Sequence, residues 1–354
     1  MKKVIVGMSG GVDSAVAAYL LKQEGYDVTG VTLRTWPSDE DNRCCKIDEA
    51  AVTARRIGIP YKVFNCVSTF KKRIVEPFVS ERMRGITLNP CVECNKAVKW
   101  EYLCYAAKVL DADLVATGHY SSIVKLPNGR YTVKRADDDA KDQSYMLCRL
   151  TQEQLSKTVF PLCSLTKQEV RRIAREASLP SAAAPDSQEL CFVSSEDTAD
   201  FVKRNSENPL SRDIGKILDT DGNILGRHNG FYRYTVGQRK GLGISSDAPY
   251  YVKKTNPVKN EVIVCRENEL YSDTVLCSDL AFMSVEDIPV GESVDASVKI
   301  RYRHAGQPAR VIRRNSDSVL LRFDTPVRAP TPGQTAVFYD KDGCIIGCGN
   351  IADF

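Results

Sequence analysis

The chain has 354 residues, 43% of them hydrophobic, which is enough to fill the cores of two or three domains. A chain of this size does not need disulfide staples, so its thirteen cysteines are either core residues or chemically active groups. The net charge of +4 does not identify a nucleic-acid partner by itself, and because neither an apolar leader nor a run of roughly 18 apolar residues occurs, we expect a cytoplasmic protein without a membrane partner.

The first half of the chain alternates short β-branched runs with segments of helical periodicity. This alternation is typical of a Rossmann-like parallel sheet with crossover helices, which makes the expected fold class α/β. The predicted elements are a strand at Lys3–Gly7, a helix from about Asp13, a strand at Val28–Leu33, a helix at Glu49–Ile57, a strand at Tyr61–Asn65 and, after another helix, a strand at Leu114–Gly118.

After about Ser195 the pattern changes to short strands separated by turn signals. The turn signals at 219–223, 254–257 and 340–343 predict β-hairpins. A break near Tyr271–Asp279 divides this β-rich half in two. We therefore expect a catalytic domain over 1–195, a small central β-rich domain over 196–270 and a C-terminal β-barrel over 271–354.

The segment after the first strand has the features of a phosphate site. In Ser9-Gly10-Gly11-Val12-Asp13-Ser14, the glycine pair lets backbone N–H groups approach an anion, and the following helix points its positive dipole end at the same place. Neither Gly-x-x-x-x-Gly-Lys-Ser/Thr nor Gly-x-Gly-x-x-Gly fits the segment. A plain glycine turn with a capping serine or aspartate is the structural alternative. The combination of strand, turn, polar residues and helix favours phosphate.

This segment resembles the phosphate loop of the ATP pyrophosphatases, which cleave ATP between the α and β phosphates and adenylate an oxygen of their substrate. The resemblance implies an N-terminal domain of that type, with Asp13 helping to position Mg²⁺. It also implies that Leu33, at the end of the second predicted strand, and Gly118, in Ala116-Thr117-Gly118-His119-Tyr120, line the adenosine pocket. Because the family includes several small-molecule synthetases, the loop indicates the chemistry and not the substrate. The expected ATP-binding residues are Gly7, Met8, Ser9, Gly10, Gly11, Val12, Asp13, Ser14, Leu33 and Gly118.

Two cysteine segments stand out from the other cysteines. Cys91 and Cys94 lie just ahead of a helix predicted to begin near Lys96, where the helix dipole and the lysine favour a thiolate. Cys191 follows about a hundred residues later. A single intracellular cysteine is more often a small core residue. We assign that role to Cys66, Cys104, Cys148, Cys163, Cys265 and Cys277.

A series of motifs resembles the bacterial tRNA-specific 2-thiouridylase family, in the same order and over essentially the whole chain. The motifs are Thr87-Leu88-Asn89-Pro90 with Cys94-Asn95-Lys96, Ala116-Thr117-Gly118-His119-Tyr120, Lys141-Asp142-Gln143-Ser144-Tyr145, Asp186-Ser187 before Cys191-Phe192, Gly237–Gly243, and Thr331-Pro332-Gly333-Gln334. The resemblance implies ATP-dependent 2-thiolation of the wobble uridine, position 34, of tRNA. It further implies that Cys191 carries a persulfide supplied by a sulfur-carrier protein and that Cys94 is its partner nucleophile, able to form a transient disulfide with it. Asn89, Pro90 and Cys91 would lie against the target base.

Position 91 departs from the family pattern, because a cysteine replaces the usual aspartate. The departure leaves any proton-transfer role at this position in doubt. It also creates a Cys-x-x-Cys that, with Cys191, resembles the iron-sulfur-dependent tRNA thiolases, in which Cys91, Cys94 and Cys191 would hold a [4Fe-4S] cluster. The remaining motifs favour the persulfide, and the cluster stays open as an alternative.

Two basic runs suit an RNA partner. Residues 299–314 carry six basic residues and no acidic one, and residues 227–240 combine four basic residues with Phe231, Tyr232 and Tyr234, which could stack on bases. A solvated strand face is the alternative for either run. By resemblance, the tRNA contacts would be Lys141, Asp142, Gln143, Arg301 and Tyr302, with His119 and Gln334 nearby.

Two other classes of function stay open. An ATP pyrophosphatase acting on a small molecule would turn over without RNA and would not use Cys94 or Cys191. A non-catalytic RNA-binding protein that senses redox state or iron would bind RNA independently of ATP.

Overall fold

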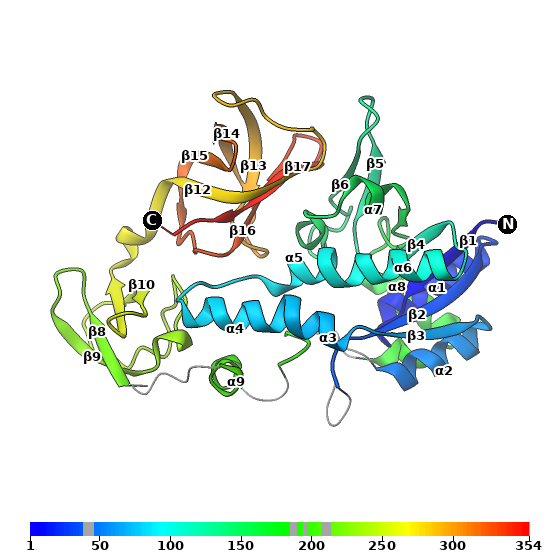
Figure 1. Cartoon of the computed structure of the whole chain (residues 1–354), viewed down its shortest axis with the longest axis horizontal. Helices are drawn as coiled ribbons and strands as arrows, with labels where there is room; N and C mark the ends of the chain where they lie inside the picture. Colours follow the sequence, from blue (N-terminus) through cyan, green and yellow to red (C-terminus); the bar gives the residue numbers. More distant parts are fainter. Residues whose placement is uncertain (38–45, 185–189, 194–196, 207–213, 354) are drawn as a thin grey trace.

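The computed structural model describes residues 1–37, 46–184, 190–193, 197–206 and 214–353. These residues form a five-stranded sheet, a four-stranded sheet, a closed barrel and a two-stranded hairpin. Figure 1 shows the barrel beside the hairpin, with the four-stranded sheet at the far end of two long helical segments. The predicted fold class, a parallel α/β sheet followed by a β-rich module and a barrel, is confirmed.

The N-terminal sheet is parallel and has the strand order β3-β2-β1-β4-β7. The chain leaves β1 for β2 on one side and returns to β4 on the other, so the ends of β1 and β4 border a crevice. The strands are β1 (Lys3–Gly7), β2 (Asp27–Arg34), β3 (Tyr61–Asn65), β4 (Leu114–Thr117) and β7 (Thr158–Val159).

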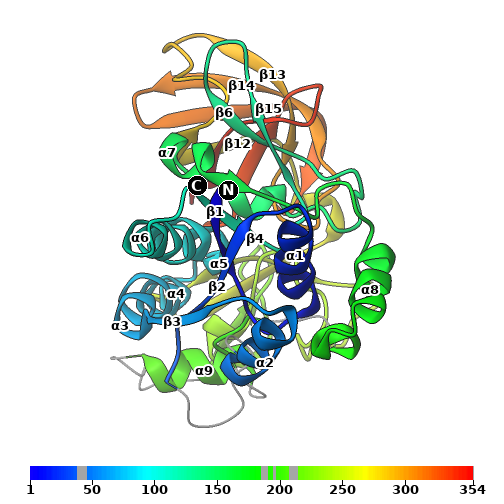
Figure 2. The ribbon, with the colours of Figure 1, turned by 90° about the vertical axis from the view of Figure 1, so that its right-hand side faces the viewer.

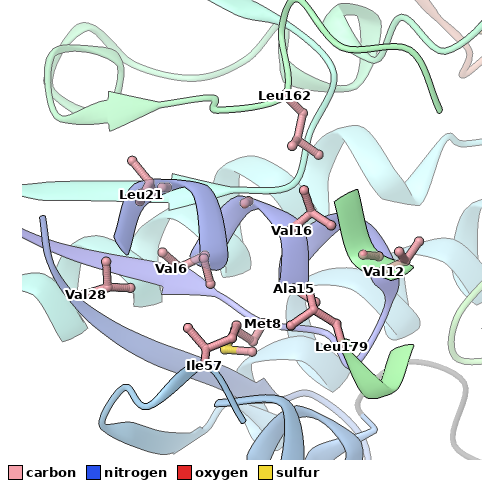
Figure 3. Packing of buried hydrophobic residues seen from close by; sticks show 14 of the residues in the cluster. Val6, Met8, Val12, Ala15, Val16, Leu21, Val28, Ile57, Leu162 and Leu179 are labelled. Atoms are coloured by element: carbon pink, nitrogen blue, oxygen red, sulfur yellow. The ribbon is translucent and has the colours of Figure 1, made fainter. Parts of the chain in front are cut away.

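Alternate side chains of β1 bury against opposite helical layers. Val4 and Val6 pack toward α1 (Val12–Gln23), α2 (Ile47–Ile57) and α8 (Lys167–Glu176), whereas Ile5 packs toward α6 (Glu101–Val109). Figure 2 shows these helices on the two sides of the sheet, and Figure 3 shows the first layer from close by. Each fully buried Val or Ile contributes about 1.5–3 kcal/mol. The helix start at the end of β1 is thus fixed by core packing.

Two long helical segments extend from the sheet toward the four-stranded sheet. The first joins α3 (Val67–Phe70), η1 (Lys71–Val75) and α4 (Glu76–Met83), and the second joins α5 (Pro90–Cys94), η2 (Asn95–Trp100) and α6. The second begins at Pro90 and not near Lys96, which corrects the predicted start. Asn89 caps it by accepting the Cys91 N–H at 3.2 Å, and proline suits the first helical position. Cys91 and Cys94 therefore lie inside the helix, and η2 is a π-helical segment that begins directly after Cys94.

The four-stranded sheet has the order β10-β11-β8-β9. The turn at 219–223 joins β8 to β9 as predicted. In the other hairpin β10 continues to Asn256, so the turn lies at 257–260, slightly later than the predicted 254–257. Its strands are β8 (Ile214–Leu218), β9 (Ile224–Asn229), β10 (Tyr251–Asn256) and β11 (Glu261–Cys265), preceded by α9 (Thr198–Asn205).

The barrel closes in the order β12-β15-β14-β13-β16-β17. Residues 271–279, where a break was expected, belong to its first strand, and the predicted turn at 340–343 joins β16 to β17. None of the helices in the described ranges is long and apolar enough to cross a membrane. The barrel strands are β12 (Tyr271–Phe282), β13 (Ser293–Lys299), β14 (Gln307–Asn315), β15 (Ser318–Arg328), β16 (Thr335–Tyr339) and β17 (Ile345–Ile351).

The barrel is attached to the helix that carries Cys91 and Cys94. The buried side chain of Arg149 donates to the backbone carbonyl of Asp279 at 2.7 Å and pairs with its carboxylate at 2.8 Å. The same guanidinium lies 3.2 Å from the Glu93 carboxylate, between the two cysteines. Burial opposes the charge on Arg149, but Cys348, Glu93 and Asp279 together raise its pKa above the ordinary value. Arg149 thus connects the first barrel strand to α5.

Replacing Arg149 with methionine should lower the free energy of unfolding by about 1–3 kcal/mol, because hydrogen bonds to a charged group are lost while both carboxylates remain partly hydrated. Arg310→Met is the matched control. Its guanidinium is 61% exposed beside Asp295, and such surface pairs contribute about 0–1 kcal/mol. Urea denaturation of both variants measures the difference. Equal midpoints for the two variants would show that Arg149 does not hold the barrel in place.

Candidate active site

A cavity of about 970 Å³ lies at the ends of β1, β2 and β4, and the barrel forms its opposite wall. Every residue expected to bind ATP lines this cavity, from Gly7 to Ser14 together with Leu33 and Gly118. Cys191 lines it as well, and so do His119, Lys141, Asp142, Gln143 and Tyr302. Asn89, Pro90, Cys91, Cys94, Arg301 and Gln334 are not part of its lining.

The loop between β1 and α1 is shaped by close backbone contacts. Gly10 has φ +82°, and a Cβ atom there would lie 2.6 Å from Cβ of Lys46, so glycine is required. The Ser14 hydroxyl donates to the Gly11 carbonyl at 3.0 Å and accepts the Ser9 N–H at 3.2 Å. A Cβ atom on Gly118 would lie 2.6 Å from the Ser14 nitrogen. The end of β4 therefore touches the start of α1, where backbone N–H groups gather.

Asp13 is held by two residues that were not predicted from the sequence. The Lys167 ammonium lies 2.7 Å from each oxygen of the Asp13 carboxylate, and the Tyr120 hydroxyl donates to one of them at 2.7 Å. Lys167 is the first residue of α8, which Thr166 and Glu169 start with a capping box. The capping box was a readable signal of a helix start. Nothing local in the sequence indicates that this helix start faces Asp13.

His119 is neutral over the physiological pH range. Burial, together with the nearby Lys99 ammonium, lowers the pKa of His119 to about 3. The ring lies 5.5 Å from that of Trp100, and its Nδ1 is 2.8 Å from the Thr117 hydroxyl. His119 therefore offers the cavity a hydrogen bond and not a charge. Lys99 also lines the cavity and was not predicted.

Cys94 and Cys191 belong to one hydrophobic cluster. Cys94 is 6% exposed within it, and the partly exposed Cys191 packs against the same cluster next to Phe192. Burial raises the pKa of Cys91, which opposes the thiolate expected at this helix start. Asp186 and Ser187 lie outside the described residues. Of the cysteines assigned to the core, Cys66, Cys148, Cys265 and Cys277 are buried, whereas Cys104 and Cys163 are partly exposed.

The three candidate cluster ligands are not arranged as a metal site. In the parts of the chain that the structure describes, no group of three or more His, Cys, Asp or Glu side chains is placed to hold a metal ion. Cys91, Cys94 and Cys191 are free thiols, and two of them lie outside the cavity lining. This geometry does not fit a [4Fe-4S] cluster.

The segment that precedes α5 is held by the barrel. The Gln334 side chain donates to the Thr87 carbonyl at 2.7 Å, and the Thr87 N–H donates to the Pro332 carbonyl at 3.0 Å. The Tyr302 hydroxyl donates to the Asp142 carbonyl at 3.3 Å. Arg301 donates to the Arg328 carbonyl at 3.0 Å. Tyr302, on the cavity wall, thus joins the barrel to the segment that carries Lys141–Gln143.

The two basic runs differ from the prediction. Phe231, Tyr232 and Tyr234 are 0%, 2% and 9% exposed in the hydrophobic core, so they are not free to stack on bases. Arg233 forms ion pairs with Asp197 and Asp200. In the other run, Arg310 and Arg313 pair with Asp295 and Asp287, whereas Lys299, Arg303 and His304 line the cavity. Composition alone did not separate the paired residues from those on the cavity wall.

The N-terminal domain is a nucleotide-binding domain of the ATP pyrophosphatase type. Two features define it: a parallel sheet with a glycine loop at the start of α1, and a cavity that reaches from that loop to a cysteine. Three family models match successive parts of the chain. They are described as tRNA methyl transferase HUP domain over residues 2–195, tRNA methyl transferase PRC-barrel domain over 200–266, and Aminomethyltransferase beta-barrel domain over 272–351.

Curated relatives match along the full chain. The tRNA-specific 2-thiouridylase MnmA of Lachnoclostridium phytofermentans is 46% identical over 361 residues, covering 99% of each chain. That of Clostridioides difficile is 42% identical over 358 residues, covering 99% of this chain and 98% of the relative. The chain belongs to the tRNA-specific 2-thiouridylase family. Among solved structures, the U34-tRNA thiolase NcsA from Methanococcus maripaludis with its [4Fe-4S] cluster is 23% identical, with a TM-score of 0.37, over 53% of this chain and 60% of that chain.

The low pKa of His119 gives a testable pH dependence. Its folded pKa of about 3 lies below the ordinary 6.5, so between these values the unfolded chain binds the proton and the folded chain does not. The contribution of His119 to stability is therefore present above pH 6.5 and is lost as the pH falls toward 3. With three histidines in the chain, NMR can follow each ring, assigned by His→Gln variants. The His119 signal should not titrate between pH 5 and 8, and a midpoint near 6.5 would contradict the buried environment.

Proposed function

We propose that this protein catalyses ATP-dependent 2-thiolation of uridine 34 in tRNA, releasing AMP and pyrophosphate. One observation carries the proposal. A single cavity is lined by the glycine loop before α1, by Cys191 and by a basic segment of the barrel, so nucleotide, sulfur and RNA groups can meet in it. Membership of the 2-thiouridylase family agrees with this arrangement.

In the first step, O2 of the uridine attacks the α phosphate of ATP, and pyrophosphate leaves. The step is needed because a pyrimidine carbonyl oxygen is a poor leaving group until it is adenylated. Backbone N–H groups at the start of α1 would stabilise the departing charge, together with the lysines that line the cavity. A carboxylate suits a hard cation, so Asp13 would hold Mg²⁺ once its oxygens exchange the Lys167 ammonium for the ion, which would supply Lewis-acid stabilisation of phosphate charge.

In the second step, a persulfide on Cys191 supplies the sulfur. Its terminal sulfur adds to C2 of the adenylated base, and the C2–O bond to AMP breaks. The Cys94 thiolate then attacks the Cys191 sulfur, which breaks the sulfur–sulfur bond and leaves the transferred sulfur on the base, with Cys94 and Cys191 as a disulfide. Alternatively, Cys94 attacks first and frees sulfide, which adds to C2. A thiol reductant returns both cysteines, and a sulfur-carrier protein reloads Cys191.

The hydrophobic cluster that Cys94 and Cys191 share supports the partnership of these two cysteines. Cys94 is fixed in the buried part of the cluster by the α5 helix, whereas Cys191 lies at its edge and reaches the cavity. Burial in this hydrophobic cluster would shield the Cys94 thiol from solvent oxidants and thiols until it meets the persulfide. Because Cys91, Cys94 and Cys191 are not arranged to hold a [4Fe-4S] cluster, no step of this mechanism uses iron.

The uridine must leave the anticodon stack to reach the cavity, which costs a few kcal/mol. Neutral His119, Gln143 and Tyr302 would hydrogen-bond or stack on the base, and Lys141, Asp142 and Arg301 would contact the strand. Asn89, Pro90, Cys91 and Gln334 are not in the cavity lining and would position the residues that contact the base. Cys91 has a raised pKa and is suited to neutral packing and not to proton transfer.

Cys191→Ser should abolish 2-thiouridine formation and leave ATP affinity within about twofold, because the hydroxyl cannot carry a persulfide but preserves the cavity. The matched control is Cys163→Ser, a partly exposed cysteine outside the cavity lining. Nucleoside analysis of tRNA by mass spectrometry measures the product. Wild-type rates in Cys191→Ser would refute the assignment.

Protein purified without oxygen should contain no stoichiometric iron or acid-labile sulfide while it thiolates tRNA. The physical reason is that, among the described residues, Cys91, Cys94 and Cys191 are not grouped as ligands of one metal ion. Metal analysis and a visible absorbance spectrum of wild type and Cys91→Ser measure this. One cluster per chain, lost in Cys91→Ser, would replace the persulfide with the cluster mechanism.

A further inference from the structure

Lys299 is a buried lysine whose ammonium reaches the cavity from the barrel. It is the last residue of β13, is 8% exposed and lines the cavity wall opposite the loop of α1. Its stem packs against Gly306, where a Cβ atom would lie 3.5 Å from Cγ of Lys299, and φ of Gly306 is +92°. The ammonium lies 6.0 Å from the Tyr302 ring centroid. Packing therefore directs this lysine toward the cavity and not toward bulk solvent.

Among the described residues, no carboxylate forms an ion pair with this ammonium. Across the described ranges, Nζ of Lys299 has neither a hydrogen bond nor an ion pair within 4 Å, although Asp142 and Asp139 attract it and Arg135 repels it from a longer distance. The Asp142 carboxylate is already engaged by the Ser144 hydroxyl at 2.9 Å and by Arg135 at 3.7 Å. Burial lowers the pKa of Lys299. A buried cation without a counter-ion is costly, so the position favours an anionic ligand.

The neighbours of Lys299 strengthen the positive potential of this wall. Arg303 and His304 line the cavity from the same segment. Burial, Arg301 and Lys299 all lower the pKa of His304, which shows that these groups share one environment. On the opposite wall, Lys46 and Lys167 lie with the glycine loop, where the nucleotide phosphates are expected. The two walls thus offer two separate anion sites.

We propose that Lys299 binds a backbone phosphate of the RNA strand next to the uridine that enters the cavity. This inference rests on the proposed function and adds a positioning contact to it. The nucleotide phosphates already have donors at the start of α1. The barrel wall holds Tyr302, which suits a base, together with Lys299 and Arg303, which suit a phosphate. A strand that delivers a base between these walls must bring its phosphates past Lys299.

The test is the salt dependence of tRNA binding by Lys299→Met, measured by fluorescence anisotropy from about 50 to 300 mM salt with the full chain. Loss of one phosphate contact should reduce the slope of log affinity against log salt by about 0.7–0.9. It should also weaken tRNA binding by several-fold to about tenfold at low salt, with the ATP dissociation constant unchanged. Lys341→Met is the matched control, an exposed lysine on the β16–β17 turn of the same barrel.

Methionine preserves the stem of Lys299, and the melting temperature of Lys299→Met should be equal to or above that of the wild type, because a buried charge is removed. If Lys299→Met folds and its slope of log affinity against log salt equals that of the wild type, the inference is overturned. The proposed function then stands as long as the wild type thiolates tRNA. A weakened ATP affinity with an unchanged tRNA slope would assign Lys299 to the nucleotide and also overturn it. If the wild type does not bind or thiolate tRNA, the proposed function fails and this inference fails with it.

Discussion

The attachment of the barrel to the N-terminal domain creates the cavity on which the chemistry depends. Three hydrogen bonds across this junction involve backbone carbonyls: Gln334 to Thr87, Tyr145 to Thr335 at 2.6 Å, and the Thr132 hydroxyl to Ile345 at 2.8 Å. Two backbone–backbone bonds also cross the junction, from the Thr87 N–H to the Pro332 carbonyl and from the Arg135 N–H to the Gly343 carbonyl, each at 3.0 Å. Side-chain rotation alone cannot break these two bonds. Without the barrel, the loop of α1 and Cys191 would lie on an open surface, and water would compete with sulfur for the activated base.

The cavity separates two kinds of polar group. Cations surround it on both walls, with Lys46, Lys99 and Lys167 on the sheet side and Lys299 and Arg303 on the barrel side. His119, which lies among them, is kept neutral by burial. The cavity therefore has cations that suit phosphates, while His119 provides a neutral hydrogen bond.

Much of the fold could be predicted from local patterns, since strand and helix periodicity in the first half and turn signals in the second are encoded within a few residues. The glycine loop was likewise readable, because strand, turn and helix follow one another in sequence. The ion pair of Asp13 with Lys167 joins residues from two helices far apart in the chain, and no local pattern specifies it. Tyr232 and Tyr234 were predicted to stack on bases because no neighbouring residue in the sequence indicates that they are buried. They are buried in a hydrophobic cluster that includes residues of α4, from the other half of the chain. The pair Asn89-Pro90 is a helix-start signal, with a capping residue followed by proline at the first helical position. The prediction placed the start near Lys96 and did not use this signal.

The most direct test is a single-turnover reaction with ATP labelled in the α phosphate, Cys191-persulfidated protein, and tRNA carrying either uridine or cytidine at position 34. We expect AMP and 2-thiouridine in equal amounts with uridine, and neither product with cytidine. AMP release without RNA would instead indicate a small-molecule substrate. RNA binding with no ATP cleavage at all would contradict the account, and would favour a non-catalytic RNA-binding protein.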